Sequence, residues 1–146
     1  MYRILLPVDS NESHVRAQID AIREAPLVTD DVEVDILHVY EEVDTPGDES
    51  GSAYINRVNE SLADLQGLPD TVTMARDALE SEGFETSVHE VAGKPAVAII
   101  ELAAEYDVDL LVVGIRRRRP IGKVVFGSVA QSVIIDSDRP VMVATG

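Results

Sequence analysis

The stretch "YRILLPV" at residues 2–8 decides the fold. Its apolar residues follow one another without strict alternation, which is typical of a strand buried on both faces and therefore of a parallel sheet. The turn-forming stretch "DSNES" comes next, and Val15, Ile19 and Ile22 then recur at helical spacing until Pro26. A buried strand, a short turn and an amphipathic helix together make the first half of a βαβ unit.

The alternation of strand and helix continues to the end of the chain. Runs rich in β-branched residues predict four further strands, and apolar residues at helical spacing predict helices between them. The expected strands are "VEVDILHVY" at 32–40, "FETSVHEV" at 84–91, "VDLLVVGI" at 108–115 and "RPVMVATG" at 139–146. The expected helices cover 70–83, 95–106 and 128–137.

The region after the second expected strand fits this pattern least. The acidic, turn-forming stretch "EEVDTPGDESGS" at 41–52 predicts a loop. Ile55, Val58, Leu62 and Leu65 then recur at helical spacing, which predicts a weaker helix that ends at "GLPD".

Strands that alternate with helices at this spacing imply right-handed βαβ units. We expect an α/β fold, a three-layer sandwich around a five-stranded parallel sheet of Rossmann-like topology with strand order 3-2-1-4-5. The 146 residues suffice for one domain with a substantial core, so residues 1–146 are expected to form a single domain. In such sheets, ligands bind beyond the carboxyl ends of the strands, where the strand order reverses.

Composition excludes several classes of protein. The chain has no cysteine, which removes disulfides, thiolate catalysis and cysteine-based metal sites. It begins without a basic leader, and no apolar run approaches the ~20 residues that a membrane span needs, so we expect a cytoplasmic protein without a membrane partner. His14, His38 and His89 fall on different expected elements without ligand spacing, and we expect them to be structural and not to bind a metal.

The chain is strongly acidic. It has 27 acidic against 12 basic residues and a formal net charge of -15, and its only lysines are Lys94 and Lys123. This composition resembles that of salt-accumulating organisms and predicts a halophilic, archaeal source; an ordinary acidic bacterial protein is the alternative. A surface this negative repels nucleic acid and anionic lipid except where its charge is locally reversed.

The charge reverses in "GIRRRRPIGKVVFGSVAQ", residues 114–131, where four consecutive arginines and a lysine occur. No acidic residue stands between Leu110 and Ile135. If the first and fourth strands are neighbours, this stretch meets the residues after two other strands, Pro7–Ser10 and His38–Tyr40. Nucleic acid is not the expected partner, because only 4% of the chain is aromatic.

Gly127 and Ser128, immediately before the last expected helix, have the features of an anion site. Backbone N–H groups at a helix N-terminus, a hydroxyl in the first turn and a glycine that permits close approach suit a phosphate, as do nearby arginines. The alternative is that Ser128 is an N-cap and Gly127 a turn residue. The stretch is not a Walker loop, because Arg117 and Val124 stand where glycine and Ser or Thr are needed.

These residues resemble the universal stress protein family. Its ATP-binding members carry Gly, two residues, Gly, nine residues, then Gly followed by Ser or Thr. Here that register falls on Gly114, Arg117, Gly127 and Ser128, so three of the four match. The stretches "ILLPVDSNES", "ILHVY", "AGKPAVAIIELAAEYDVDLLVVG" and "GSVAQSV...RPVMVA" also resemble the family. The resemblance covers nearly the whole chain outside 41–84 and implies an adenine nucleotide alpha hydrolase-like topology.

The resemblance implies a regulatory adenosine nucleotide, ATP or AMP with or without magnesium, bound in a stress response. It sets the adenine against Asp9 and the backbone of Val39, in a pocket lined by Pro7, Val8 and Ser10. It assigns Gly114 to the ribose and phosphates, and Gly127, Ser128 and Val129 to the phosphates. Ile115, Arg116 and Arg117 complete the set of residues predicted to bind the nucleotide.

Arg117, in place of the second glycine, leaves two interpretations open. Its side chain either blocks the close backbone approach to the phosphates, or supplies positive charge that replaces lost amide contacts. In the second case the protein binds nucleotide and is at most a slow ATPase, since no catalytic residue is apparent. In the first it is an interaction module of the same family. The resemblance also implies a homodimer through the C-terminal strand, Val141–Val143, with its unpaired apolar edge.

Overall fold

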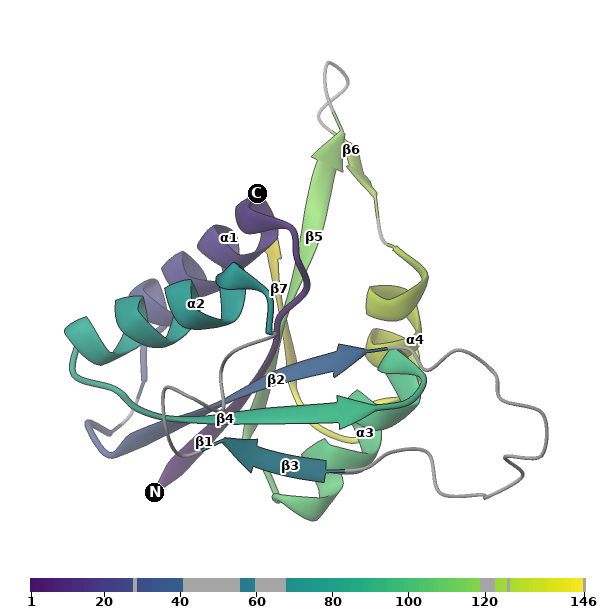
Figure 1. Ribbon diagram of the computed structural model, residues 1–146. Helices are drawn as coiled ribbons and strands as arrows, with labels where there is room; N and C mark the ends of the chain where they lie inside the picture. Colours follow the sequence, from purple (N-terminus) through teal and green to yellow (C-terminus); the bar gives the residue numbers. More distant parts are fainter. Residues whose placement is uncertain (28, 41–55, 60–67, 119–122, 126, 146) are drawn as a thin grey trace.

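The computed structural model describes residues 1–27, 29–40, 56–59, 68–118, 123–125 and 127–145, and of 56–59, 116–118 and 123–125 the backbone alone. Strands and helices alternate through this part of the chain (Figure 1). The strands are β1 (Tyr2–Pro7), β2 (Val32–Tyr40), β3 (Asn56–Asn59), β4 (Glu85–Ala92), β5 (Leu110–Arg118), β6 (Lys123–Val125) and β7 (Val141–Thr145). The helices are α1 (Glu12–Glu24), α2 (Asp70–Ser81), α3 (Pro95–Glu105) and α4 (Ser128–Asp136).

Five parallel strands are arranged side by side in the order β4-β2-β1-β5-β7. Numbered along the chain without the two short strands, this is the order 3-2-1-4-5, which confirms the prediction. The chain moves outwards from β1 in one direction through β2 and β4, and in the other through β5 and β7. The order therefore reverses between β1 and β5, where the sequence analysis expected the ligand.

Two short antiparallel strands were not expected from the sequence. β6 pairs with the end of β5, and β3 pairs with β4. The predicted helix beginning at Ile55 is wrong for residues 56–59, which form β3; its remainder lies outside the described residues. The backbone of β4 offers hydrogen-bonding groups to β3, and such tertiary pairing overrides the local helical spacing of apolar residues.

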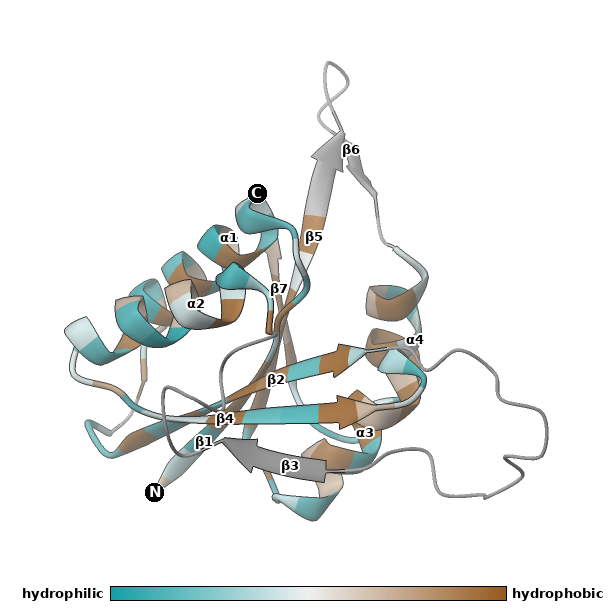
Figure 2. Cartoon of the chain, viewed as in Figure 1, coloured by the Kyte–Doolittle hydropathy of each residue, from teal (hydrophilic) through white to brown (hydrophobic). Residues whose placement is uncertain are grey.

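Helices cover both faces of the parallel sheet (Figure 1). α1 and α2 pack on one face and share one hydrophobic cluster with it. α3 and α4 pack on the other face and share a second cluster. Ile4, Leu5 and Leu6 of β1 are fully buried although they point to alternating faces, which explains the unbroken apolar run at the start of the sequence. In Figure 2, α1 and α2 are striped with hydrophilic and hydrophobic residues, as expected of helices with one buried face. Among the described residues, no helix has the length and apolarity to cross a membrane.

A buried polar network joins three strands to the end of α3. The carboxylate of Asp35 on β2, which is fully buried, accepts a hydrogen bond from Arg3 Nη2 at 2.9 Å and lies 3.0 Å from Nε2 of His89. The second ring nitrogen of His89 lies 3.2 Å from the hydroxyl of Tyr106, whose carbonyl oxygen accepts from Arg3 Nη1. His89 is therefore structural, as predicted. Asp35 has the partners that a buried charge requires.

The fork between β1 and β5 is held by a side chain of α1. The two strands pair over only two residues each, and β1 then reaches Pro7, which has no N–H to donate. Gln18 Nε2 donates instead to the carbonyl oxygens of Pro7, at 2.7 Å, and Val112, at 2.9 Å. Because both partners are acceptors, the amide nitrogen must face them, so the orientation of the amide is determined. The strands thus diverge around a buried amide.

We expect Gln18→Leu to lower the free energy of unfolding by about 2 kcal/mol or more, because the buried bond to Val112 and the partly buried bond to Pro7 are both lost while the side-chain volume changes little. Urea denaturation at high salt measures this change. The matched control is Gln131→Leu, at an exposed position of α4, which is expected to change stability by less than about 0.5 kcal/mol. Equal changes in the two variants would contradict a role for the Gln18 bonds.

We expect Asp35→Ala to cost about 3 kcal/mol of unfolding free energy, because Arg3 and His89 keep their polar groups and lose the shared acceptor. The part of Arg3 that reaches solvent keeps the cost at the lower end of the range for buried pairs. Thermal unfolding of this variant is compared with that of Glu85→Ala, an exposed residue at the start of β4. If Asp35→Ala melts at the same temperature as Glu85→Ala, the polar network does not contribute to the stability of the fold.

Candidate functional site

A cavity of about 490 Å³ opens beyond the fork between β1 and β5. This size is within the ~300–1,000 Å³ typical of small-molecule sites. Its walls come from the end of β1 and the residues after it, the second half of β2, the middle of β5, the first two turns of α1 and α3, and the first turn of α4. The expectation that three strand ends meet at one crevice agrees with this arrangement.

Most of the residues predicted to bind nucleotide line this cavity. They are Pro7, Val8, Asp9, Val39, Gly114, Ile115, Gly127, Ser128 and Val129. Ser10 is exposed and lies outside the lining. The backbone of Arg116 and Arg117 belongs to β5 directly after Ile115, and the side chains of both lie outside the described part of the protein.

A second group of lining residues was not predicted from the sequence. They are His14, Gln18, Leu37, Pro95, Ile99, Val113 and Ala130. The apolar members were predicted only as core or helix-start residues, because nothing in the local pattern separates a cavity wall from a core. Gln18 had a signal: it is a polar residue on the same helical stripe as Val15, Ile19 and Ile22.

Val39 presents an open main-chain edge to the cavity. Val8 N–H donates to Leu37 O at 2.8 Å, and β1 has ended by this point. On the other side of β2, Tyr40 O accepts from Gly93 N–H. Since successive residues of a strand point their backbone groups to opposite sides, the N–H and C=O of Val39 face the side that β1 has left. No described residue hydrogen-bonds to them there.

The N-terminus of α4 forms another part of the cavity wall. Gly127 is the N-cap and Ser128 the first helical residue, so the alternative in which Ser128 caps the helix is wrong. Gly127 has no side chain that caps the amides, whereas Asn11 at the start of α1 accepts from two backbone N–H groups. A Cβ atom at Gly127 would meet nothing within 4 Å, so packing within the described protein does not require glycine here.

Packing within the protein favours glycine at position 114. A Cβ atom there would lie 3.0 Å from His14 Cβ and 3.1 Å from His14 O, closer than most real contacts of this kind. Gly114 therefore lets α1 pack directly against β5 above the fork. The resemblance assigned Gly114 to close approach of a ligand; the structure adds close approach of a helix.

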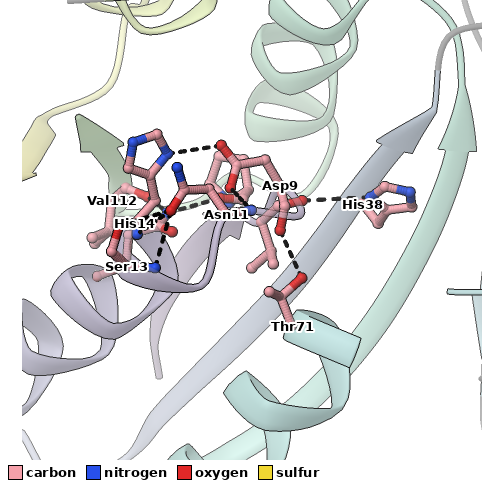
Figure 3. A network of polar contacts seen from close by, with 10 residues as sticks. Asp9, Asn11, Ser13, His14, His38, Thr71 and Val112 are labelled. Carbon is pink, nitrogen blue, oxygen red and sulfur yellow. Dashed lines mark hydrogen bonds and ion pairs between the residues drawn. The ribbon is translucent and has the colours of Figure 1, made fainter. Parts of the chain in front are cut away.

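The loop after β1 is held by a network around Asp9 (Figure 3). Asp9 Oδ1 accepts from Asn11 N–H at 2.9 Å, and Asp9 Oδ2 lies 2.9 Å from His14 Nδ1. The backbone oxygen of Asp9 accepts from Thr71 Oγ1 at 2.6 Å, which ties the loop to the start of α2. His14 thus belongs to the site. His38 is not among the lining residues, and its Nδ1 lies 3.4 Å from Val8 O. Within the described residues, no group of three or more His, Asp or Glu side chains is arranged to hold a metal.

Arg117 occupies an extended strand. It pairs with Val124 of β6 in an antiparallel register that begins at Arg116 and Val125. Extended residues have negative φ, so arginine at this position is not forced into a left-handed conformation. The substitution for glycine therefore carries no backbone strain of that kind.

Known proteins share the sequence pattern and the fold of this chain. A sequence model of the universal stress protein family matches residues 1–145. Stress response protein NhaX of Bacillus subtilis is 25% identical, over 97% of this chain and 96% of its own length. A universal stress protein structure from Archaeoglobus fulgidus has 28% identity and a TM-score of 0.69, covering 99% of this chain and 98% of that one. A universal stress protein from the same organism in complex with dAMP has 25% identity and a TM-score of 0.65, with the same coverage. The chain belongs to the universal stress protein family.

Proposed function

We propose that the cavity binds an adenosine nucleotide, ATP or AMP, as a regulatory ligand in a stress response, with at most slow hydrolysis. The observation that carries this proposal is that a single cavity is lined both by the open main-chain edge of Val39 and by the N-terminus of α4. The dAMP complex of the Archaeoglobus relative supports a nucleotide in this family.

Adenine complements the Val39 end of the cavity. The N–H of Val39 suits the acceptor N1 of adenine, and its C=O suits the exocyclic amine. Leu37, Ile99 and Val113 supply apolar surface on which a flat base is removed from water. Asp9 stands beside them with a carboxylate that accepts hydrogen bonds and repels an anion.

The phosphates belong at the α4 end. Backbone amides at the start of a helix and the positive end of its dipole favour an anion, and Gly127, Ser128 and Val129 line the cavity there. No acid occurs in the sequence from Leu110 to Ile135, so negative charge on this stretch does not oppose a phosphate. Arg116 and Arg117, which follow directly after Ile115, add positive charge to the same segment.

We expect ATP, ADP or AMP at millimolar concentration to raise the melting temperature, and Gly127→Val to abolish the rise. Ligand at a hundred times its Kd stabilises a protein by about 2.7 kcal/mol. Valine at 127 fits the free protein, where its Cβ meets open space, and keeps phosphate away from the amides. The assay is a thermal shift with and without magnesium.

The control for Gly127→Val is Ala104→Val, at an exposed position of α3, which should respond to nucleotide like the unmodified protein. A melting temperature that none of the three nucleotides raises in the unmodified protein would rule out the proposed function.

A second candidate function is that of a homodimeric interaction module, and the position of β7 favours it. In the described sheet β7 pairs with β5 alone. Pro140 O accepts from Leu111 N–H, so by alternation the N–H groups of Val141 and Val143 point away from β5. A second copy can pair with this edge. α4, which leads into β7, also carries Ile135 with 70% of its surface exposed.

We expect light scattering at high salt to give twice the monomer mass, and Val143→Pro to give the monomer mass. Proline removes the outward N–H and leaves the pairing of β7 with β5 intact. Circular dichroism verifies that the variant is folded, and Ile135→Lys provides a second variant that leaves the strand unchanged. A monomeric mass for the unmodified protein would contradict the dimer.

A further inference from the structure

We propose that His14 is a positioning residue of the nucleotide site: it fixes the carboxylate of Asp9 so that this carboxylate accepts hydrogen bonds from the nucleoside part of the ligand. The inference rests on the proposed nucleotide function and deepens it. It assigns to Asp9 a ligand group that donates hydrogen bonds, such as an amine or a ribose hydroxyl, and it assigns to His14 no contact with the ligand.

The geometry of the carboxylate carries the proposal (Figure 3). Among the described residues each oxygen of Asp9 has one partner, the N–H of Asn11 for Oδ1 and Nδ1 of His14 for Oδ2, both at 2.9 Å. A carboxylate oxygen accepts more than one hydrogen bond, so both oxygens keep capacity for a ligand. The side chain of Asp9 is 59% exposed, and without these partners its rotamers would interconvert freely.

His14 is well suited to hold Asp9, because it is itself held. Only 19% of its side chain is exposed, and its backbone N–H donates to Asn11 Oδ1. Its Cβ and carbonyl oxygen lie against Gly114 of β5, where a side chain on the strand would push them away. Thr71 fixes the backbone of Asp9 from the other side. Asp9 is therefore fastened through its carboxylate to the start of α1 and, by way of His14, to β5, and through its backbone to α2.

The direction of the hydrogen bond follows from the partners. An ionised carboxylate can only accept, so Nδ1 of His14 carries the proton. Nε2 is buried and has no partner among the described residues, so in this arrangement the ring engages Asp9 alone. Asp9 also lies just before the N-terminus of α1, where the helix dipole favours negative charge. The fixed carboxylate of Asp9 therefore repels a phosphate group and favours a ligand group that donates a hydrogen bond.

The test is a double-mutant cycle in binding. Isothermal titration measures the Kd of AMP for the unmodified protein, His14→Ala, Asp9→Asn and the double variant. We expect His14→Ala to weaken AMP binding about tenfold, and the double variant to bind no more weakly than Asp9→Asn. His14→Asn, which keeps a side-chain N–H at a similar place, should restore most of the affinity.

Analogues of AMP provide a readout that a merely structural role would not change. Purine riboside monophosphate lacks the amine, and dAMP lacks the 2′-hydroxyl. We expect the analogue that lacks the group donating to Asp9 to bind the unmodified protein more weakly than AMP does. In His14→Ala, the difference in affinity between AMP and this analogue should become smaller. The matched control is Ser13→Ala, the neighbouring residue of α1, whose hydroxyl donates to Asn11 and not to Asp9.

The outcomes separate the two proposals. If the unmodified protein binds no nucleotide, the proposed function fails and the role of His14 fails with it. If it binds AMP and His14→Ala binds equally well, the function stands and the positioning role is wrong. If His14→Ala still weakens binding in the Asp9→Asn background, His14 does not act through Asp9, and the proposal is overturned.

Discussion

The rest of the site depends on one amide, that of Gln18 in the fork between β1 and β5. Two parallel strands that stop pairing leave unsatisfied carbonyls, which are costly when buried. Pro7 ends the ladder because it cannot donate, and the amide nitrogen of Gln18 satisfies the carbonyls of Pro7 and Val112. The strands can therefore separate without exposing their backbone groups. The cavity lies where they separate.

The contact of Gln18 with the two strands also accounts for the residue types at neighbouring positions. Gln18 reaches both carbonyls only if α1 lies close to β5, and a side chain at Gly114 would hold the helix away. His14, one turn earlier on α1, is brought by this packing to the rim of the cavity. Asp9 follows Pro7 by two residues and so meets His14. A backbone requirement of the fold thus places the polar groups that the site needs.

The sequence was sufficient where local pattern and tertiary structure agree. The unbroken apolar runs predicted the buried parallel strands, and nine of the sixteen lining residues of the cavity were predicted from the strand ends, the start of the last helix and the family resemblance. β3 could not be predicted, because its pairing with β4 is non-local and its one apolar residue, Val58, belongs to a series at helical spacing that runs from Ile55 to Leu65. Gln18 could have been recognised as a polar residue in the apolar stripe of α1. The role of His14 could not, because it depends on Asp9 and Gly114 meeting in space.

Pairing of Arg117 with Val124 changes how the phosphate end of the cavity must work. In the family pattern a second glycine stands at this position, where its backbone can come close to a phosphate. Here that backbone is part of an antiparallel pair with β6, which projects beyond the parallel sheet (Figure 1). Among the described residues, the amides at the start of α4 then remain as backbone donors for a phosphate, and the arginines of this segment would add positive charge. Arginine replaces glycine here without backbone strain because the residue lies in an extended strand, and the proposed phosphate site would then rest on the N-terminus of α4 and on the positive charge of this segment.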